Sequence, residues 1–359
     1  MARMLATQCY SLGLVPLVFC KSKTDSAAQV VGELFHDTGR VESLLDFAKH
    51  VDVIIIENEF VNLEYLALSA QKFPVYPSVD SLSLVQNKFD QKNNLKKFKL
   101  PTADFLAIEN ADDLEIAIMK LGSKLVLKSS TMGYDGKGTI FFDSEKTTAS
   151  RFFNQNPQFQ GYAEKFIDFK AELAVVVARD IHDHVETFPV VETYQKNGIC
   201  HWVKKSKFSE SINKKAVNIA KKVMTSFEAV GVFGVEMFLT KKNDIVINEL
   251  APRVHNSGHI TMNACNVSQF EQHLRAVTGL KLAKPQWIYN GACMVNIIGA
   301  KELQELIFDD SKLTESSFIY WYGKKGHALN RKLGHINVVG KKTEDCFKQA
   351  MNIRETINI

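Results

Sequence analysis

Apolar and polar residues follow one another near the N-terminus in a pattern that predicts an α/β domain. Residues 51–56 read Val-Asp-Val-Ile-Ile-Ile, a short and largely β-branched run that is typical of a buried parallel strand. Glu57 and Glu59 follow this run directly. Ligands of α/β sheets collect at the carboxyl ends of the strands, so both carboxylates are candidate binding residues, although a polar loop would look the same. We expect residues 1–84 to form one domain.

A β-hairpin is predicted over residues 234–247, where two apolar strands flank a polar turn. If Lys242 and Asn243 form a two-residue turn, Glu236 lies directly opposite Glu249. Facing residues have Cβ atoms about 5 Å apart, and like charges at that distance are destabilising. A divalent cation would reverse this effect, and magnesium accepts carboxylate oxygens while leaving positions open for phosphates. The alternative is a solvated pair of glutamates.

The remainder of the chain divides into two regions, 85–282 and 283–359. The first is an α+β region in which Ala216, Ala220 and Val223 share one face of a helix expected over 214–229. The other expected elements are strands at 125–127, 173–178, 292–298 and 335–339 and a closing helix at 343–354. The sequence contains no internal repeats and no low-complexity tracts.

Composition narrows the class of protein. A length of 359 residues fits two or three domains, and 45% hydrophobic and 23% charged residues are ordinary for globular proteins. The net charge of +4 suits anionic ligands but is too small to indicate nucleic-acid binding. The six cysteines are scattered without a C-x-x-C motif, which argues against disulfides or zinc and for a cytoplasmic protein. No apolar run is long enough to span a bilayer, so we expect no membrane partner.

The densest candidate chemistry lies in residues 248–259, Asn-Glu-Leu-Ala-Pro-Arg-Val-His-Asn-Ser-Gly-His. This segment holds a carboxylate, a guanidinium, two imidazoles, two amides and a hydroxyl. A purely structural loop does not need so many groups that bind metals and anions. The segment is therefore a candidate active site.

A glycine-bearing loop is a second candidate. A predicted strand ends in Lys128, and three glycines follow at 133, 136 and 138. Glycines let backbone N–H groups approach phosphate oxygens closely, and a lysine adds positive charge. The loop lacks the G-K-[ST] ending of a Walker A sequence. It predicts a nucleotide-phosphate loop, or else a glycine-bearing hairpin.

Two further segments carry weaker signals. Residues 164–167, Glu-Lys-Phe-Ile, could line an adenine pocket together with Glu172, although a plain strand would fit equally well. Residues 322–325 and 331–335 place lysines and an arginine on both sides of a predicted turn. Cations so placed can clamp a phosphate, whereas the alternative is a solvated basic loop.

In this order, the lysine, glycine loop, E-K-F-I, paired glutamates and N-E-L-A-P-R resemble the ATP-grasp fold. The continuation P-R-V-H-N-S-G-H and the closing R-K-x-G-H-I resemble the N5-carboxyaminoimidazole ribonucleotide synthetase family of purine biosynthesis. The resemblance covers nearly the whole chain. It implies an N-terminal Rossmann-like pre-ATP-grasp domain at 1–84, an ATP-grasp domain at 85–282 and a small β-rich domain at 283–359.

The family is a ligase that uses ATP and magnesium to carboxylate 5-aminoimidazole ribonucleotide with bicarbonate, through carboxyphosphate. Members are commonly dimeric, so the resemblance implies a homodimer. Such chemistry needs positioning and charge neutralisation more than a covalent nucleophile.

The resemblance also assigns residues. It implies that Arg253, His255 and Asn256 bind bicarbonate and stabilise the developing charge of carboxyphosphate. It implies that magnesium is bound by Glu236 and Glu249. The residues that it implies for ATP binding are Lys88, Lys128, Gly133, Asp135, Gly136, Lys137, Gly138, Glu164, Lys165, Phe166, Ile167, Glu172, Asn248 and Glu249. The residues that it implies for ribonucleotide binding are Glu57, Tyr134, Lys324, Arg331 and Lys332, with the C-terminal cations at the phosphate of the ribonucleotide.

Three positions depart from the family pattern. The family opens with a strand and a G-x-G-Q-L turn before R-M-L, whereas this sequence opens at Met1-Ala2-Arg3-Met4-Leu5, so we expect the first strand to be absent. Ser130 stands where the family has arginine, and Met132 stands where it has glycine. A side chain at 132 could crowd the phosphates. Two other readings stay open: a formate-dependent glycinamide ribonucleotide transformylase, or a binding protein on a decayed ATP-grasp scaffold.

Overall fold

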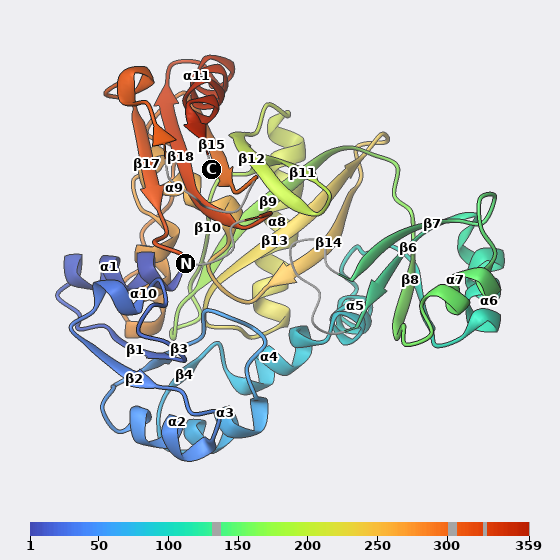
Figure 1. Cartoon of the computed structure of the whole chain (residues 1–359), viewed down its shortest axis with the longest axis horizontal. Coiled ribbons are helices and arrows are strands. Elements are labelled where there is room, and N and C mark those ends of the chain that lie inside the picture. The colour runs from blue at the N-terminus through green and yellow to red at the C-terminus, as the bar shows by residue number, and fades with distance from the viewer. Residues whose placement is uncertain (131–137, 301–306, 326–328, 359) are drawn as a thin grey trace.

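The computed structural model describes residues 1–130, 138–300, 307–325 and 329–358. The N-terminal region alternates short strands and helices (Figure 1). Its strands form two parallel pairs, β1 with β2 and β3 with β4. The run at 51–56 contributes only the two-residue strand β3. The elements are α1 (Ala2–Ser11), β1 (Leu17–Cys20), η1 (Ala28–Val30), β2 (Glu33–His36), α2 (Val41–Ala48), β3 (Ile54–Ile55), α3 (Leu63–Ala70), β4 (Val75–Tyr76) and α4 (Val79–Gln86).

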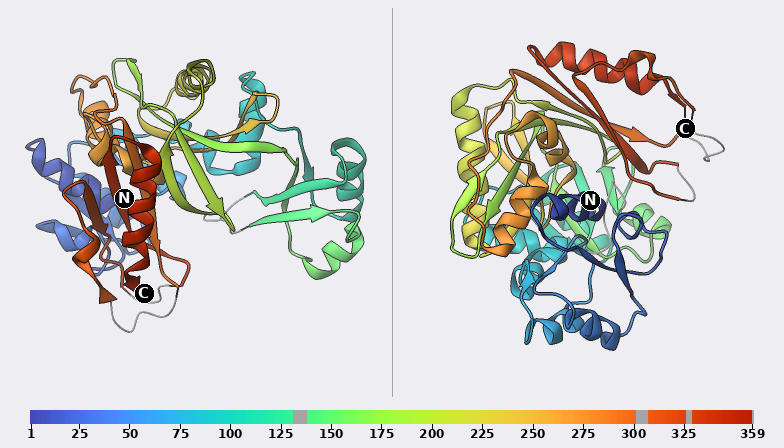
Figure 2. Two further views of the ribbon diagram at one scale, coloured as in Figure 1. Left: turned by 90° about the horizontal axis from the view of Figure 1, so that it is seen from above. Right: turned by 90° about the vertical axis from the view of Figure 1, so that its left-hand side faces the viewer.

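A small lobe projects away from the rest of the molecule after helix α5 (Lys88–Lys97), as both Figure 1 and the left view of Figure 2 show. It is a four-stranded antiparallel sheet in the order β5-β8-β6-β7, and its core lies under two helices. The elements are β5 (Phe105–Ile108), α6 (Ala111–Leu121), β6 (Lys124–Ser129), β7 (Thr139–Asp143), α7 (Ala149–Gln155) and β8 (Gly161–Lys165).

One large sheet joins the middle and C-terminal regions. Its described strands run in the order β14-β13-β9-β11-β12-β15-β18-β17, with β10 beside β9. Strand β12 pairs with β15, so the sheet continues across the boundary expected at 283. Its strands are β9 (Phe169–Arg179), β10 (Val185–Thr187), β11 (Val191–Lys196), β12 (Ile199–Lys205), β13 (Gly231–Thr240), β14 (Ile245–Ala251), β15 (Gly291–Ile298), β17 (Ser317–Trp321) and β18 (Lys332–Gly340).

Helices cover this sheet where the sequence is amphipathic. Helix α8 (Glu210–Ser226) buries Ala216, Ala220 and Val223 in the core over β9 and β13, which confirms the predicted face. The helix ends before the expected residue 229. The remaining elements are η2 (Asn256–Ile260), α9 (Thr261–Ala264), α10 (Gln269–Thr278), β16 (Ile307–Phe308), η3 (Asp310–Lys312), α11 (Thr343–Glu355) and β19 (Ile357–Asn358). Among the helices described, none has both the length and the apolar character to cross a bilayer.

Candidate active site

A single continuous cleft is lined by residues of all three regions of the chain. Glu57, Lys128, Glu249, Arg253 and Lys324 all line it, although they lie far apart in sequence. The structure therefore brings together residues from each of the motifs predicted from the sequence.

The β13–β14 hairpin places Glu236 directly opposite Glu249, which confirms the predicted pairing. The predicted two-residue turn is wrong, because Asn243, with φ of 66°, closes a three-residue loop between Thr240 and Asp244. A β-bulge between Glu236 and Met237 then shifts the register by one residue. The longer turn and the bulge cancel each other at the glutamate pair. Bulges also redirect side chains next to functional sites.

Two lysines reach this hairpin, Lys88 from helix α5 and Lys128 from strand β6 of the small lobe. The Nζ atom of Lys88 lies 2.9 Å from an oxygen of Glu249, and that of Lys128 donates to the Asn248 side-chain oxygen at 3.0 Å. Burial alone would raise the pKa of the Glu249 carboxyl, but Lys88 and Lys128 outweigh burial and hold that pKa well below its usual range. The carboxylate is therefore ionised at neutral pH, as a cation ligand must be.

Glu164, which is expected to bind ATP, lines the cleft, and its carboxylate is held between two lysines. One oxygen contacts Lys92 and the other lies 2.7 Å from Lys128. Lys92 is almost fully buried and also donates to the Thr102 hydroxyl at 2.9 Å. Sequence reasoning missed Lys92, since a lysine on a polar helix gives no sign that it is buried. The contact with Glu164 holds the Lys128 ammonium in place.

An aromatic wall lines the cleft next to Lys165 and Ile167. Phe166 is 38% exposed and Phe141 is 75% exposed, and their ring centroids lie 6.4 Å apart. The rings of Phe169 and Phe238 stack at 4.6 Å. Such exposed rings offer an adenine base a stacking surface. Phe141 and Phe238 were not foreseen, because an apolar residue in a strand reads as core until the pairing is known.

Glu172 lies beside Glu236, in the same part of the cleft. The backbone N–H of Gln195 donates to Glu172 at 3.1 Å, and the side chain of Gln195 donates to Glu236 at 3.1 Å. Burial and the nearby Glu236 carboxylate together raise the pKa of Glu172 to about 7. Gln195 carried no recognisable motif, so the sequence gave no reason to expect it here.

His255 continues the line of polar groups from the hairpin. Its Nε2 atom lies 3.3 Å from Glu236, and its Nδ1 atom lies 2.8 Å from the Ser257 hydroxyl. Gly234 packs against the ring so closely that an added Cβ would lie 2.5 Å from His255 Cγ. Glycine fits at 234 because a larger side chain would clash with the His255 ring.

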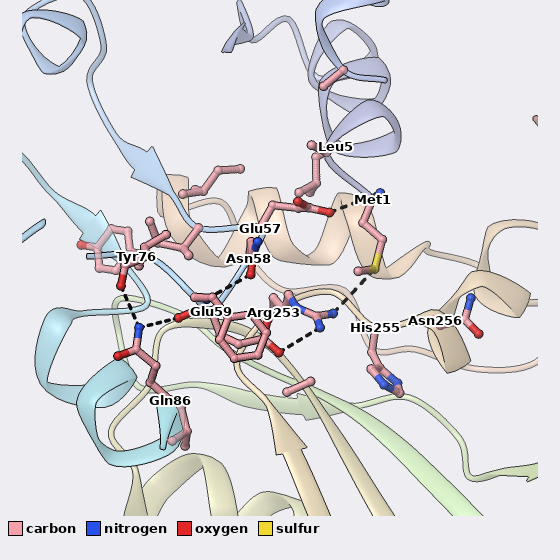
Figure 3. Close-up of a pocket in the computed structure, with 18 of the residues that line it drawn as sticks. Met1, Leu5, Glu57, Asn58, Glu59, Tyr76, Gln86, Arg253, His255 and Asn256 are labelled. Carbon is pink, nitrogen blue, oxygen red and sulfur yellow. Dashed lines mark hydrogen bonds and ion pairs between the residues drawn. The ribbon is translucent and has the colours of Figure 1, made fainter. Parts of the chain in front are cut away.

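Arg253 and Asn256 complete the predicted bicarbonate set, and Figure 3 shows them with His255 beside the Glu57–Glu59 segment. Glu59 binds the guanidinium of Arg253 through both carboxylate oxygens, at 2.5 and 3.0 Å. The Asn256 side chain forms a reciprocal amide pair with Asn296, at 3.0 and 2.8 Å. Both side chains are thus fixed before any ligand arrives.

The C-terminal cations Lys324, Arg331 and Lys332 line the same cleft, as do Glu57 and Met1. Arg331 donates to the Lys325 carbonyl at 3.0 Å, and the Lys324 ammonium lies 5.6 Å from the centre of the Tyr322 ring. The N-terminal ammonium of Met1 lies 3.4 Å from Glu57.

Most of the glycine loop lies outside the described residues, namely Met132, Gly133, Tyr134, Asp135, Gly136 and Lys137. At its edges, the Gly138 carbonyl accepts from Ser129 at 2.8 Å, and the Ser130 carbonyl accepts from the Lys88 backbone at 2.8 Å. The second contact ties the loop's entrance to helix α5.

The chain matches three family models in succession. They are a ribonucleotide synthetase preATP-grasp domain at residues 1–86, an ATP-grasp domain at 93–270 and a phosphoribosylaminoimidazole carboxylase C-terminal domain at 292–349. The N5-carboxyaminoimidazole ribonucleotide synthase of Synechococcus elongatus is 35% identical over 94% of this chain and 87% of that protein. The chain belongs to the N5-carboxyaminoimidazole ribonucleotide synthase family.

Other members of this synthase family are longer. The phosphoribosylaminoimidazole carboxylase of Candida glabrata is 35% identical over 97% of this chain, but the chain spans only 63% of that protein's length. Among solved structures, an ADP complex of N5-carboxyaminoimidazole ribonucleotide synthetase is 32% identical, with a TM-score of 0.91 over 98% of this chain and 93% of that one. The synthase of Aspergillus clavatus, in complex with ADP and 5-aminoimidazole ribonucleotide, is 29% identical, with a TM-score of 0.86 over 98% and 95%. The pre-ATP-grasp, ATP-grasp and C-terminal architecture expected from the sequence is therefore confirmed.

Proposed function

We propose that this chain is a ligase that uses ATP to carboxylate the exocyclic amine of 5-aminoimidazole ribonucleotide with bicarbonate, in purine biosynthesis. The observation that carries the proposal is that one cleft contains three sets of residues. They are Arg253 with His255, the facing Glu236–Glu249 pair, and the cations Lys324 and Arg331. This set provides groups for a nucleotide, for a small anion and for a second phosphate. The Aspergillus clavatus relative was crystallised with a nucleotide, ADP, and with 5-aminoimidazole ribonucleotide.

In the reaction, a bicarbonate oxygen attacks the γ-phosphorus of ATP, and the bond to the β-phosphate oxygen breaks to release ADP. The amine nitrogen of the ribonucleotide then attacks the carboxyl carbon of carboxyphosphate, phosphate leaves, and the amine loses a proton. Arg253 and His255 stabilise the negative charge that develops on the carboxyphosphate oxygens. Lys128 holds the phosphates of ATP, with Glu164 and Asn248 fixing its direction.

The ribonucleotide phosphate is assigned to Lys324, Arg331 and Lys332, and its sugar or base to Glu57. The aromatic rings of Phe141, Phe166 and Phe238 hold the adenine of ATP by stacking, with Lys165, Ile167 and Glu172 around it. Asn256 acts beside Arg253 on bicarbonate. Lys88 neutralises phosphate charge together with the residues of the glycine loop, which include Gly138.

Magnesium fits the donor set of the hairpin. Magnesium commonly uses one or two carboxylates plus substrate phosphates, and Glu236 and Glu249 face each other beside two lysines suited to phosphate. Within the described residues, no group of three or more histidine, cysteine or acidic side chains is arranged to hold a metal by itself. When bound, the ion would neutralise charge on the phosphates. Glu236 is kept in place by Gln195 and His255.

We further propose a cytoplasmic location and a homodimer, both in keeping with the family. None of the six cysteines, all of which lie in the described residues, forms a disulfide. Cysteines that form no disulfide are usual in a reducing compartment. Size-exclusion chromatography with light scattering would give the oligomeric state.

Carbon transfer from isotopically labelled bicarbonate tests the proposed function. The purified chain is incubated with ATP, magnesium and the ribonucleotide, and the labelled carbon is followed by NMR. The proposal predicts a new carbamate signal that requires ATP. Labelled formate should give no product, and transfer from formate to glycinamide ribonucleotide would point to the transformylase instead.

A further inference from the structure

Glu59 bridges the N-terminal region and the segment that follows strand β14 by its contact with Arg253. Its oxygens lie 2.5 Å from Nε and 3.0 Å from Nη2 of the guanidinium, in the side-by-side geometry of a bidentate pair. The two side chains are only 16% and 18% exposed. Such a pair is shielded from solvent screening, and its two parallel bonds fix the plane of the guanidinium.

Both partners are anchored at the backbone. On the Glu59 side, the Gln86 amide at the end of α4 donates to the carbonyls of Glu59 and Val61, each at 2.7 Å (Figure 3). On the Arg253 side, the Gln269 side chain accepts from the His255 N–H at 2.8 Å and donates to the His255 carbonyl at 2.7 Å. The ion pair therefore joins two segments whose backbones are each held by a glutamine side chain.

We infer that Glu59 is a positioning residue for bicarbonate: it holds the Arg253 guanidinium in the orientation in which its remaining N–H group meets the anion. This inference rests on the proposed function, and it assigns a role that sequence motifs left undefined. A guanidinium has five N–H donors. Glu59 takes two of them, the Val254 carbonyl accepts a third at 3.2 Å, and the Met1 sulfur lies 4.0 Å from Nη1. One N–H of Nη2 then remains for the anion, and a guanidinium already held in this way loses little further side-chain entropy on binding.

The same segment links the two substrates. Glu57, two residues earlier, lines the cleft where the ribonucleotide is proposed to bind, and it is 34% exposed. Glu59 lines the same cleft and binds Arg253. The two carboxylates therefore have different tasks, and substitutions at them should change different kinetic constants.

The test compares Glu59→Gln, Glu59→Asp and Glu57→Gln under steady-state conditions. Glu59→Gln places an amide N–H against the guanidinium, so the apparent KM for bicarbonate should rise about tenfold or more, equivalent to about 1.4 kcal/mol, while that for ATP stays unchanged. Glu59→Asp keeps the charge and should recover part of the loss. Glu57→Gln should instead raise the apparent KM for the ribonucleotide. An unchanged bicarbonate KM in Glu59→Gln would overturn the inference.

A second readout does not depend on turnover. Modification of Arg253 by phenylglyoxal, mapped by peptide mass spectrometry, should be slow in the wild-type chain and faster in Glu59→Gln. Equal rates would overturn the inference even if the activity changed. Glu271→Gln is the matched control, since it breaks an Arg275–Glu271 pair of 2.8–2.9 Å on helix α10. It should alter neither the bicarbonate constant nor Arg253 reactivity. Wild-type protein without bicarbonate-dependent turnover would refute the proposed function, and the reactivity of Arg253 would still decide whether Glu59 holds it.

Discussion

The carboxylates of the cleft differ in charge state because their immediate neighbours differ. Glu249 lies beside Lys88 and is ionised, whereas Glu172 lies beside another carboxylate and has a pKa near neutrality. The sequence shows where the carboxylates are, but the neighbours of each come from distant elements, such as Lys88 in α5 and Glu236 in β13. The pairings of Glu164 with Lys92 and of Glu59 with Arg253 were therefore beyond sequence reasoning.

Glu249→Gln should abolish ATP hydrolysis while leaving the fold intact. The variant loses a negative charge from the pair that is proposed to hold magnesium, and the expected increase in barrier is several kcal/mol. Turnover is measured by ADP release, and the fold by thermal unfolding. Near-normal turnover would remove the metal assignment of this residue.

Glu172→Gln should stabilise the ligand-free protein at pH 8 but not near pH 4.5. A carboxyl with a folded pKa of about 7 keeps its proton between pH 4.5 and 7, whereas the unfolded chain has already lost it. Wild-type stability therefore falls as pH rises through this window and levels off above it, by no more than about 3 kcal/mol. Glutamine does not titrate. Chemical denaturation of both proteins without magnesium or nucleotide checks this, and parallel pH curves would contradict it.

The β13–β14 hairpin shows which parts of an element can be read from sequence. Two apolar runs and the polar turn between them predicted both strands and the glutamate pair, and all three are observed. The three-residue turn and the bulge were not foreseen, because Asn243 can adopt a positive φ in several turn types. The pairing of Glu236 with Glu249 was thus correct for a reason that was only partly right.

Gly234→Ala tests whether β13 positions His255. The new Cβ would lie 2.5 Å from His255 Cγ, so the ring must shift from its present position beside Glu236. We expect a loss of turnover of about a hundredfold, with a stability loss of about 1–3 kcal/mol from overpacking. Gly32→Ala is the control, because an added Cβ there has no atom within 4 Å. Equal activity in the two variants would show that the position of His255 does not depend on Gly234.

At the scale of the whole molecule, one sheet carries the ATP-grasp hairpin at β14 and the C-terminal cations next to β18. Three regions were expected from the sequence, and their succession was confirmed by the three family matches. The sheet shared by the middle and C-terminal regions was not expected, because sequence periodicity does not show which strands pair. The two ends of the cleft are thus joined by a continuous hydrogen-bonded scaffold.

Arg331→Ala and Lys128→Ala should separate the two ends of the cleft. A charge-assisted contact to phosphate contributes about 1.5–3 kcal/mol, so Arg331→Ala should raise the apparent KM for the ribonucleotide about ten- to a hundredfold. The constant for ATP should barely change. Lys128→Ala should show the opposite pattern. Equal weakening of both substrates with a lower melting temperature would indicate a folding defect instead.

Phosphate release with each substrate omitted in turn tests the central claim most directly. The account predicts that the full mixture of ATP, magnesium, bicarbonate and 5-aminoimidazole ribonucleotide releases phosphate rapidly. Omission of either bicarbonate or the ribonucleotide should reduce release to a small residual rate. Phosphate release that is indifferent to both omissions, or that requires formate in place of bicarbonate, would contradict it.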